Sequence, residues 1–445
     1  MLIRSISGVR GLVADDLTVP VAQIYARAVD DLLPAGEIVL GRDSRPSGAG
    51  LIVGISDELL ALGRNVVECG IVPTPTVQFI TEQLKAAGGI IVTASHNPIE
   101  WNGLKFVRAD GTFFHSEQCA RLFDHVDSGC DTIHIGDSGR RVICNDAVQK
   151  HVNHVLKLDC IDVSGIRDRK FKIVIDAVNG AGAEALPTVL VALGCQVIPL
   201  YCEPSGEFLR GTEPLPENLT ALGTTVLEHQ AAAGFAVDPD ADRLAIVSEK
   251  GVPLGEENTL VLAVDGYWRT TGKPVPIVVN LSTTMALDKL ADQYGTKVVR
   301  SAVGEINVVQ LMQTLDAPLG GEGNGGVILK AAHLGRDSLV GVAMVLNRMA
   351  QSTEPLSELV ASLPQFVMVK DKVSLEGVDV EKALATVKQA FPEADVNMVD
   401  GVKFTWNDRW VHLRKSNTEA IMRIYAEAET ERAAKELVNQ VKKLI

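Results

Sequence analysis

Aromatic residues are scarce in this sequence: they make up 4% of its 445 positions, although hydrophobic residues together make up 46%. A core built from this composition must be mostly aliphatic. Short aliphatic runs are typical of α/β proteins, whose parallel strands are buried on both faces. No run approaches the ~20 residues of a membrane-spanning helix, and the first residues lack the apolar stretch of a secretory signal. We therefore expect a cytoplasmic protein without a membrane partner.

Positive charge is in short supply as well. The chain has 42 lysines and arginines against 56 aspartates and glutamates, which gives a formal net charge of -14. This excess argues against nucleic acid and anionic membranes as partners. An anionic ligand would need a local cluster of cations or a metal ion to overcome the overall field.

The cysteines follow no pairing pattern. The seven are scattered without a Cys-x-x-Cys motif, and Cys69, Cys144 and Cys195 lie in or beside apolar runs. This usage predicts buried, reduced thiols of the kind found in a reducing cytoplasm.

What the chain does have is an alternation of strand-like apolar runs and helical spacing, which starts three times. Strands are predicted at 37–41, 65–69 and 89–93, then at 172–176, 196–200 and 234–237, and then at 276–281, 297–300 and 326–329. Helical spacing occupies segments such as 56–63 and 183–193. This βαβ pattern predicts doubly wound α/β sheets, and its three rounds of ~100 to 150 residues predict three similar domains.

The end of the chain has a different pattern. Strands are predicted at 410–413 and 421–426, followed by an amphipathic helix over 431–445. We therefore expect a smaller α+β domain at the C-terminus. The predicted domains are 1–148, 149–250 and 251–365 for the α/β units and 366–445 for the last one.

Ser95 is the first candidate for chemistry. It lies in Thr93–Pro98, directly after the apolar run that ends at Val92, and Asn-Pro behind it favours a turn. A serine displayed at the edge of a sheet is a candidate nucleophile and carrier of a phosphoryl group, and His96 beside it can handle a proton. Downstream, Trp101–Lys105 is interpreted as a turn whose cation returns to the same loop.

Three carboxylates at alternate positions form the second candidate site. Asp238, Asp240 and Asp242 directly follow an apolar strand, on a turn stiffened by Pro239. Such a trio can converge on one hard cation. An EF-hand is excluded because position 6 of that loop needs glycine and this chain has Arg243, and because a strand follows where a helix is required. Mg²⁺ is the predicted ion.

Two further loops offer polar groups for a ligand. The glycine-rich stretch Gly320–Gly326 fits G-x-G-x-x-G formally, but a strand follows it where a dinucleotide site needs a helix. Within it, Glu322 and Asn324 suit sugar hydroxyls. The second loop is a predicted phosphate cradle of guanidinium, hydroxyl and amide groups: Arg414, Ser416, Asn417 and Thr418, with Arg423 beyond. The order of these motifs, one in each domain, predicts one shared cleft.

Taken together, the motifs resemble those of the α-D-phosphohexomutase superfamily, which includes phosphoglucomutase, phosphomannomutase and phosphoglucosamine mutase, and the resemblance covers essentially the whole chain. The segments that carry it are similar to the family's phosphoserine, metal, sugar and phosphate loops and to two signatures of its first domain: Thr93–Pro98, Asp238–Arg243, Gly321–Gly325, Arg414–Glu419, Gly8–Gly11 and Gly41–Arg45. The resemblance implies a heart-shaped protein with a central cleft and a Ser95 that is phosphorylated at rest.

The resemblance also implies a mechanism. Phosphorylated Ser95, bridged by Mg²⁺ to Asp238, Asp240 and Asp242, would give its phosphoryl group to a hexose phosphate. A bound hexose 1,6-bisphosphate, which is also the expected activator, would turn around and return a phosphoryl group to Ser95. Arg10, Lys105 and Arg243 would stabilise the transferring group, and Arg10 or Lys105, with or without His96, would handle the proton. Glu322 and Asn324 would bind sugar hydroxyls. The phosphate that does not react would be bound by Arg414, Ser416, Asn417, Thr418 and Arg423.

Several positions depart from the pattern that the chain resembles. Bacterial members often have serine and histidine where this chain has Asn324 and Gly326, proline where it has Lys415 and Ala420, and glycine where it has Pro239. The chain length and the Gly-Glu-Gly-Asn-Gly-Gly variant resemble the branch that acts on glucosamine phosphate, with phosphomannose or phosphoglucose as the alternative substrate. A metal-dependent sugar phosphatase and a non-enzymatic sugar-phosphate sensor are the rival classes, and a monomer or a homodimer is equally compatible.

Overall fold

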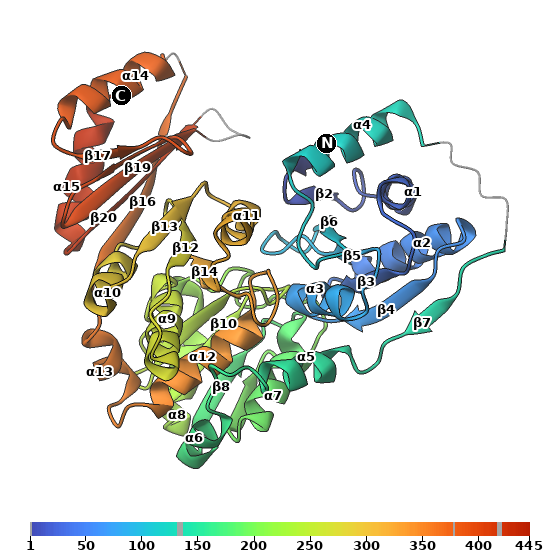
Figure 1. Ribbon diagram of the computed structural model, residues 1–445, viewed down its shortest axis with the longest axis horizontal. Coiled ribbons are helices and arrows are strands. Elements are labelled where there is room, and N and C mark those ends of the chain that lie inside the picture. The colour runs from blue at the N-terminus through green and yellow to red at the C-terminus, as the bar shows by residue number, and fades with distance from the viewer. Residues whose placement is uncertain (1, 131–136, 377–378, 416–420) are drawn as a thin grey trace. The chain divides into compact units, whose positions relative to one another are not determined.

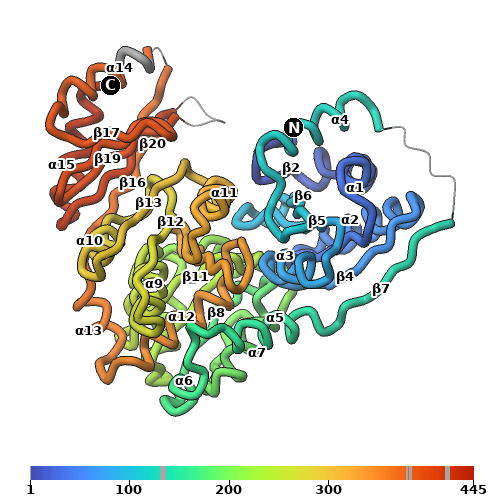
Figure 2. The backbone as a smooth tube through the Cα atoms, viewed as in Figure 1, coloured from blue at the N-terminus to red at the C-terminus, as the bar shows by residue number. Residues whose placement is uncertain are grey.

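The computed structural model describes residues 2–130, 137–376, 379–415 and 421–445. The chain divides into two compact units, residues 1–272 with 324–359 and residues 273–323 with 360–445. The backbone therefore passes from one unit to the other at 272–273, 323–324 and 359–360, and the colours of Figure 2 allow these passages to be followed. No described helix is long and apolar enough to cross a membrane.

Within the described residues, the first unit begins with a seven-stranded mixed sheet in the order β1-β2-β6-β5-β3-β4-β7. Its strands are β1 (Ile3–Ser5), β2 (Gly8–Leu12), β3 (Ile38–Arg42), β4 (Val66–Ile71), β5 (Gly88–Val92), β6 (Trp101–Arg108) and β7 (Arg141–Ile143). β3 pairs in parallel with β4 and β5, and β4 with β7. β6, β2 and β1 continue the sheet in antiparallel pairing.

Helices cover both faces of this sheet (Figure 1): α1 (Val19–Leu32), α2 (Ser47–Ala61), α3 (Thr74–Gln83) and α4 (Ser116–Ser128). Successive residues of a strand point to opposite faces. Leu40 of β3 packs in one core cluster with Tyr25 of α1 and Ile55 of α2. A Cβ at the next residue, Gly41, would lie 2.4 Å from Val77 of α3, so α3 covers the other face, and the predicted doubly wound arrangement is confirmed.

One predicted local structure is wrong. Residues Trp101–Lys105, interpreted as a turn, form the first part of strand β6, in which Lys105 pairs with Ile91 of β5. Gly103 permits a close approach of backbone chains: a Cβ there would lie 2.6 Å from the carbonyl oxygen of Thr93 and 2.7 Å from that of Val9. Lys105 is therefore presented by a rigid strand next to β5, the strand that ends before Ser95.

The second sheet of the first unit has the order β11-β10-β8-β9 among the described residues. Its strands are β8 (Lys172–Asp176), β9 (Gln196–Leu200), β10 (Ala233–Val237) and β11 (Leu244–Ser248), and the helices around it are α5 (Ala147–Val155), α6 (Val163–Arg169), α7 (Gly182–Ala192) and α8 (Thr220–His229), with a 3₁₀ turn at Pro216–Asn218. β9, β8 and β10 are parallel, and β11 is antiparallel to β10. The loop between β10 and β11 carries the three aspartates.

Helix α12 (Ser338–Ala350) is buried over almost its whole length in the first unit. It packs on α9 (Glu257–Thr271), on α6 and α7, and on strand β15 (Gly326–Leu329). Asp337 caps its N-terminus, because one carboxylate oxygen accepts hydrogen bonds from the backbone of Leu339 and Val340. The loop that carries Arg336 is therefore anchored in the same unit as Ser95 and the aspartates.

The second unit contains a parallel set of strands, β13-β12-β14, and the C-terminal antiparallel sheet β16-β20-β19-β18-β17. The elements are β12 (Ile277–Asn280), β13 (Val298–Ser301), β14 (Leu319–Glu322), α10 (Ala286–Tyr294), α11 (Glu305–Leu315), β16 (Val367–Ser374), α14 (Val380–Ala390), β17 (Asp395–Asn397), β18 (Val402–Thr405), β19 (Arg409–Lys415), β20 (Ile421–Ala428) and α15 (Glu431–Lys442). Helix α13 (Leu356–Ala361) spans the change from the first unit to the second.

The predicted C-terminal α+β domain is confirmed. Strands β19 and β20 include the two predicted strands, and α15 ends at Lys442, slightly before the predicted end at 445. Buried Glu427 of β20 joins this sheet to the start of α10, because its Oε2 accepts hydrogen bonds from Met285 N at 2.7 Å and from Trp410 Nε1 at 2.6 Å. Together with the three preceding α/β parts, this gives the predicted four-part α/β architecture.

Candidate functional site

Ser95 lies in the loop that follows β5 and is 2% exposed. Its φ is +50°, in the left-handed region that non-glycine residues seldom adopt. Such a conformation persists only where the surroundings hold it. Ser95 Oγ lies 3.2 Å from Asp238 Oδ2, to which it donates a hydrogen bond, and 3.5 Å from His96 Nδ1.

A buried network holds this loop in place. Arg45 Nη2 donates a hydrogen bond of 2.8 Å to the carbonyl oxygen of Ser95 and another to that of Asn97. Ser95 N in turn donates to Thr93 Oγ1 at 2.9 Å, and Thr93 Oγ1 donates to Asp43 Oδ2 at 2.6 Å. Asp43 also pairs with Arg45. The segment Gly41–Arg45 therefore acts on the site by fixing the serine loop.

The predicted convergence of the three aspartates is found. One carboxylate oxygen from each of Asp238, Asp240 and Asp242 lies within 4.8 Å of the other two, and all three residues are at most 1% exposed. Asp238 Oδ1 accepts hydrogen bonds from the backbone N–H groups of Asp242 and Arg243. A left-handed Ala241, with φ +53°, closes the turn. A short loop between two strands thus aims three carboxylates at one point.

Two cations from distant parts of the chain contact this trio. Lys105 Nζ lies 2.6 Å from Asp240 Oδ2 and 3.5 Å from Asp242 Oδ2. Arg336 Nη2 lies 2.6 Å from Asp242 Oδ2. Burial alone would raise the pKa of Asp240, but the charge and hydrogen bond of Lys105 outweigh it and hold that pKa below its usual range. Thr74 Oγ1 adds a hydrogen bond of 2.8 Å to the same carboxylate.

Arg243 and Arg10 add further positive charge near Ser95 and the three aspartates. Arg243 Nε lies 3.7 Å from Asp238 Oδ2 and its Nη2 lies 3.2 Å from His96 Nδ1. Arg10 Nη1 donates a hydrogen bond of 3.0 Å to Asn97 Oδ1 in the serine loop. Burial, together with the charges of Arg243 and Arg10, lowers the pKa of His96 to about 3. His96 is therefore uncharged at neutral pH.

The donor set fits a hard divalent cation. Asp240 Oδ1 and Asp242 Oδ1 are buried and have no hydrogen-bond partner among the described residues, although buried carboxylate oxygens are normally satisfied. Burial and the charges of Asp242 and Asp240 raise the pKa of Asp238 well above its usual value, so ionising the whole trio is costly. An oxygen-seeking ion such as Mg²⁺ would supply the missing partner and relieve the repulsion.

The glycine-rich loop divides between the two units. Asn324 Oδ1 accepts a hydrogen bond from Gly326 N in the first unit. A Cβ at Gly326 would lie 2.3 Å from Cδ of Arg336. The absence of a side chain at 326 therefore makes room for Arg336, the cation that contacts Asp242. His333 is directed elsewhere, since its Nε2 lies 3.0 Å from Asp337 Oδ2.

In the second unit, Glu322 and Arg414 are connected by a short series of contacts. Glu322 Oε1 accepts hydrogen bonds from Asn280 Nδ2 at 2.8 Å and from Gly304 N at 3.1 Å. The residue before Gly304, Val303, donates its N–H to Asp400 Oδ2, and Arg414 Nε donates to Asp400 Oδ1 at 2.9 Å. The predicted hydroxyl-reading and phosphate-binding side chains thus share one framework within this unit.

The structure describes only part of the predicted phosphate loop. Ser416, Asn417 and Thr418 lie outside the described residues. Arg423, an exposed residue of β20, pairs in register with Arg414 of β19. Two guanidinium-bearing residues therefore lie side by side on adjacent strands that flank this loop.

Sequence reasoning missed three contributors to the site in the first unit. Arg336 had no local signal, since Gly335–Asp337 carries no pattern beyond a helix cap. Thr74 follows a strand by three residues, and both its backbone N–H and its hydroxyl hold Asp240. Arg45 belongs to a segment that resembles a signature of the family, and only the fold shows that it holds the loop of Ser95.

Comparison with known proteins gives a consistent result over the whole chain. Four family profiles match residues 2–131, 149–251, 256–366 and 369–444; they are described as phosphoglucomutase/phosphomannomutase, alpha/beta/alpha domains I, II and III, and the C-terminal domain.

Individual relatives match at nearly full length. A protein of Methanopyrus kandleri named "Probable phosphoglucosamine mutase" is 35% identical over 436 residues, 97% of this chain and 95% of the relative. A Thermococcus kodakarensis protein named "Phosphoglucomutase/phosphomannomutase" is 34% identical over 98% of this chain and 97% of its own. The crystal structure of a phosphoglucomutase/phosphomannomutase family protein from Burkholderia thailandensis has a TM-score of 0.86 and 26% identity, and covers 99% of this chain and 97% of its own.

Proposed function

Because this chain belongs to the phosphoglucomutase/phosphomannomutase family, we propose that it interconverts hexose 6-phosphate and hexose 1-phosphate through a phosphorylated Ser95. The chain is an enzyme of the intramolecular phosphotransferase class, as its relatives are. The observation that carries the proposal is the 3.2 Å distance from Ser95 Oγ to Asp238 Oδ2. It brings a nucleophilic hydroxyl to a buried group of three carboxylates.

Mg²⁺ is the proposed resident ion, held by Asp238, Asp240 and Asp242 together with Ser95. When bound, it would withdraw charge from the transferring phosphoryl group. The buried Oδ1 atoms of Asp240 and Asp242, which lack a hydrogen-bond partner within the described part of the chain, support this assignment. A readout that does not depend on turnover is Mg²⁺ binding by calorimetry, which Asp240→Asn should weaken at least tenfold. Unchanged binding would remove Asp240 from the ion site.

Side chains of the first unit are proposed to stabilise the transferring phosphoryl group and to move the proton. Arg10, Lys105, Arg243 and Arg336 place positive charge around the carboxylates, where the oxygens of a phosphoryl group would be stabilised by fixed charges.

In the forward half-reaction, the P–O bond to Ser95 breaks and a P–O bond to the sugar oxygen forms. The proton of the sugar hydroxyl must finally reach Ser95 Oγ. Arg10, Lys105 and His96 are the proposed groups for proton handling. His96 is uncharged at neutral pH and a weak base, whereas Lys105 remains charged and suits the donating part, because Asp240 and Asp242 raise its pKa against the opposing effect of burial.

The second half-reaction needs the hexose 1,6-bisphosphate to turn around, so that its other phosphate faces Ser95. We propose that Arg414, Ser416, Asn417, Thr418 and Arg423 bind the phosphate that is not reacting. Glu322 and Asn324 would contact sugar hydroxyls in both orientations. Added hexose 1,6-bisphosphate is the proposed activator, because it phosphorylates any enzyme that has lost its phosphoryl group.

Glucosamine phosphate is the proposed preferred substrate. Support comes from relatives at 31–35% identity that are named as phosphoglucosamine mutases. Phosphomannomutase or phosphoglucomutase activity is the alternative, favoured by the Thermococcus kodakarensis relative of that name at 34% identity. A panel of hexose 1-phosphates, assayed with the matching 1,6-bisphosphate and ranked by kcat/KM, decides between them.

The test of the covalent mechanism compares Ser95→Ala with Ser56→Ala. Ser56 is a matched control, since its hydroxyl is also buried but has no hydrogen-bond partner in the part of the chain that the structure describes. Wild-type protein incubated with hexose 1,6-bisphosphate should gain the mass of one phosphoryl group, as should Ser56→Ala. Ser95→Ala should gain none and should lose nearly all turnover. Ordinary turnover by Ser95→Ala would contradict the proposal, and steady release of inorganic phosphate without any need for the bisphosphate would identify a phosphatase.

A further inference from the structure

Two cysteines meet at the edge of the first sheet. Cys69 lies in β4, and Cys144 directly follows β7, the strand that pairs in parallel with β4. Glu68 is opposite Ile143 in this pairing, and Cys144 N donates a hydrogen bond of 2.8 Å to the carbonyl oxygen of Glu68. The two cysteines are therefore neighbours on adjacent strands, and strand spacing lies within the Cα separation that a disulfide spans.

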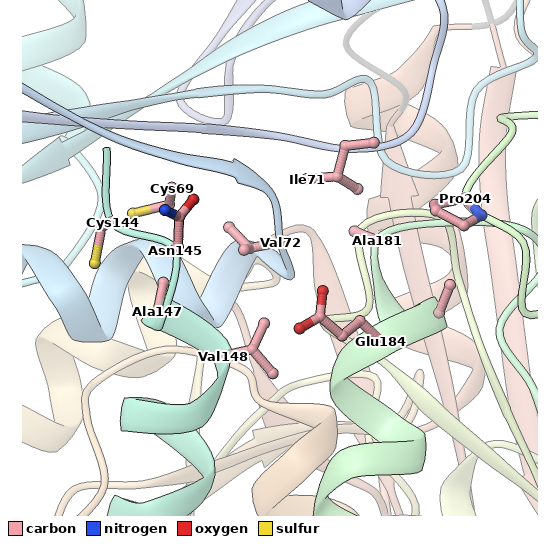
Figure 3. Close-up of a pocket in the computed structure, with 11 residues that line it drawn as sticks. Cys69, Ile71, Val72, Cys144, Asn145, Ala147, Val148, Ala181, Glu184 and Pro204 are labelled. Carbon is pink, nitrogen blue, oxygen red and sulfur yellow. The ribbon is translucent and has the colours of Figure 1, made fainter. Parts of the chain in front are cut away.

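Both thiols border a cavity of about 320 Å³ in the first unit. Figure 3 shows the two sulfur atoms at one end of this cavity, with Val148 of α5 and the carboxylate of Glu184 of α7 directed into it. Cys69 and Cys144 each keep 8% exposure. A small polar oxidant can therefore approach the pair without unfolding the sheet.

Charges of both signs contact Cys144. Lys150 Nζ lies 3.7 Å from Cys144 Sγ, opposed by Asp146 Oδ1 at 3.5 Å. The neighbouring Cys69 thiol, followed by the charge of Lys150, lowers the pKa of Cys144 to about 7, whereas the pKa of Cys69 is raised well above its usual value. Cys195 makes a useful contrast: it is equally exposed at 8%, but burial raises its pKa to about 12. Cys144 is thus the reactive thiol and Cys69 the protonated partner.

We propose that Cys69 and Cys144 form a reversible oxidation site that a hydroperoxide converts into a disulfide. In the first step, the Cys144 thiolate attacks the peroxide; the O–O bond breaks, sulfur becomes a sulfenic acid, and hydroxide or the corresponding alkoxide leaves and takes up a proton from water. In the second step, the Cys69 sulfur attacks the sulfenic acid, an S–S bond forms, the S–O bond breaks, and water leaves with the thiol proton. A dithiol reductant restores both thiols by exchange. The disulfide would fix β7 to β4 at the sheet edge.

Thiol reactivity of the reduced wild-type protein gives the first test. At neutral pH, iodoacetamide should label Cys144 about tenfold or more faster than Cys195, because labelling requires the thiolate. Trypsin places Cys69 in residues 65–85 and Cys144 in residues 142–150, each with no other cysteine. After treatment with hydrogen peroxide, these two peptides should be found linked by mass, and two of the seven thiols should be lost. Equal labelling of Cys144 and Cys195, or two unlinked peptides, would overturn the proposal.

Variants separate the two steps. Cys69→Ser should leave a sulfenic acid at Cys144 that dimedone traps, and Cys144→Ser should abolish both the adduct and the linkage. Lys150→Gln should slow the labelling of Cys144 several-fold. Cys195→Ser is the matched control and should retain the linked peptides. Dimedone capture at Cys69 in the Cys144→Ser variant, with the same rate as capture at Cys144, would contradict the assignment of the reactive thiol.

Discussion

Arg336 Nη2 lies 2.6 Å from Asp242 Oδ2, and the Arg336 side chain fills the space next to Gly326, where a Cβ would approach its Cδ to 2.3 Å. The glycine and the arginine are therefore complementary. This relationship gives a physical reason for Gly326 at a position where the family that the chain resembles often carries histidine. Arg336, from a loop anchored by α12, adds to the positive charge that Lys105 and Arg243 place near Asp242.

The first prediction concerns this pair. Gly326→Ala should displace Arg336 from Asp242 and lower kcat by about tenfold, because a fixed cation near the transferring group is lost or misplaced. Steady-state kinetics with the preferred hexose phosphate measures the effect. Gly341→Ala is the matched control: it lies in α12, and a Cβ there would find its nearest neighbour at 3.4 Å. Similar kcat values for both variants would show that the position of Arg336 does not matter to turnover.

Lys105 offers a second prediction, which separates ion binding from catalysis. Lys105 Nζ lies 2.6 Å from Asp240 Oδ2, so it competes for the same carboxylate as the proposed Mg²⁺. Lys105→Gln should therefore tighten Mg²⁺ binding, measured by calorimetry, while kcat falls by about 10²-fold through loss of charge at the transferring group.

The two effects of Lys105→Gln have opposite directions, and general misfolding would not produce them together. Arg108→Gln serves as the control on the same strand, since the Arg108 side chain is 33% exposed and pairs with Asp110. That variant should leave both Mg²⁺ affinity and kcat unchanged. Weaker Mg²⁺ binding in Lys105→Gln would mean that Lys105 supports the carboxylate group instead of competing for it.

The sequence predicted the parts of the site that depend on neighbours along the chain. Ser95 and the three aspartates each follow an apolar run, and the loop after a buried strand displays its residues at the sheet edge. The strands around them were predicted within a few residues. The domain boundaries at 148, 250 and 365 stay a prediction, as do the roles of the individual side chains.

What the sequence could not supply is the set of contacts between distant segments. Lys105 and Asp240 are 135 positions apart, and Arg336 and Asp242 are 94 apart. No local pattern encodes such pairs, because they follow from the packing of whole elements. The error at Trp101–Lys105 has a related cause: Gly103 is needed for a close approach of neighbouring strands, and in sequence it is indistinguishable from a turn glycine.

The third prediction concerns stability at a buried cluster that joins α5 to the start of α12. Asp337 Oδ2 lies 2.9 Å from His151 Nε2 and 3.0 Å from His333 Nε2, and all three residues are at most 2% exposed. Asp337→Ala should lower the free energy of unfolding by about 3 kcal/mol, because two buried imidazoles lose their acceptor and α12 loses its cap. Urea unfolding measures this value.

Asp337→Asn should be less destabilising than Asp337→Ala, since the amide oxygen can still cap α12. Asp159→Ala, at an exposed position of the same unit, should change the free energy of unfolding by less than about 0.5 kcal/mol. If Asp337→Ala proves as stable as Asp159→Ala, the cluster contributes nothing to the packing of α12.

The fourth prediction is a pH dependence that arises at His412 in β19. Its Nδ1 lies 2.9 Å from Ser282 Oγ and its Nε2 lies 2.6 Å from the carbonyl oxygen of Asp400, so the neutral ring, with Nε2 donating and Nδ1 accepting, satisfies both. Burial lowers the pKa of His412 from 6.5 to about 4, although the hydrogen bond to Asp400 acts in the opposite direction. Between these two pKa values, His412 therefore binds a proton in the unfolded chain but not in the folded chain.

The direction of this pH dependence follows from proton linkage. The stability that comes from a neutral His412 is present above pH 6.5 and is lost as the pH falls towards 4, because the unfolded state alone takes up the proton in that window. Between pH 7 and pH 5 the loss amounts to about 2 kcal/mol. His412→Gln removes the titrating group. Between pH 7 and pH 5, its free energy of unfolding should therefore fall by about 2 kcal/mol less than that of the wild-type protein. His229→Gln, at an exposed position, should keep the wild-type pH dependence, and an identical slope in all three proteins would exclude His412 as its source.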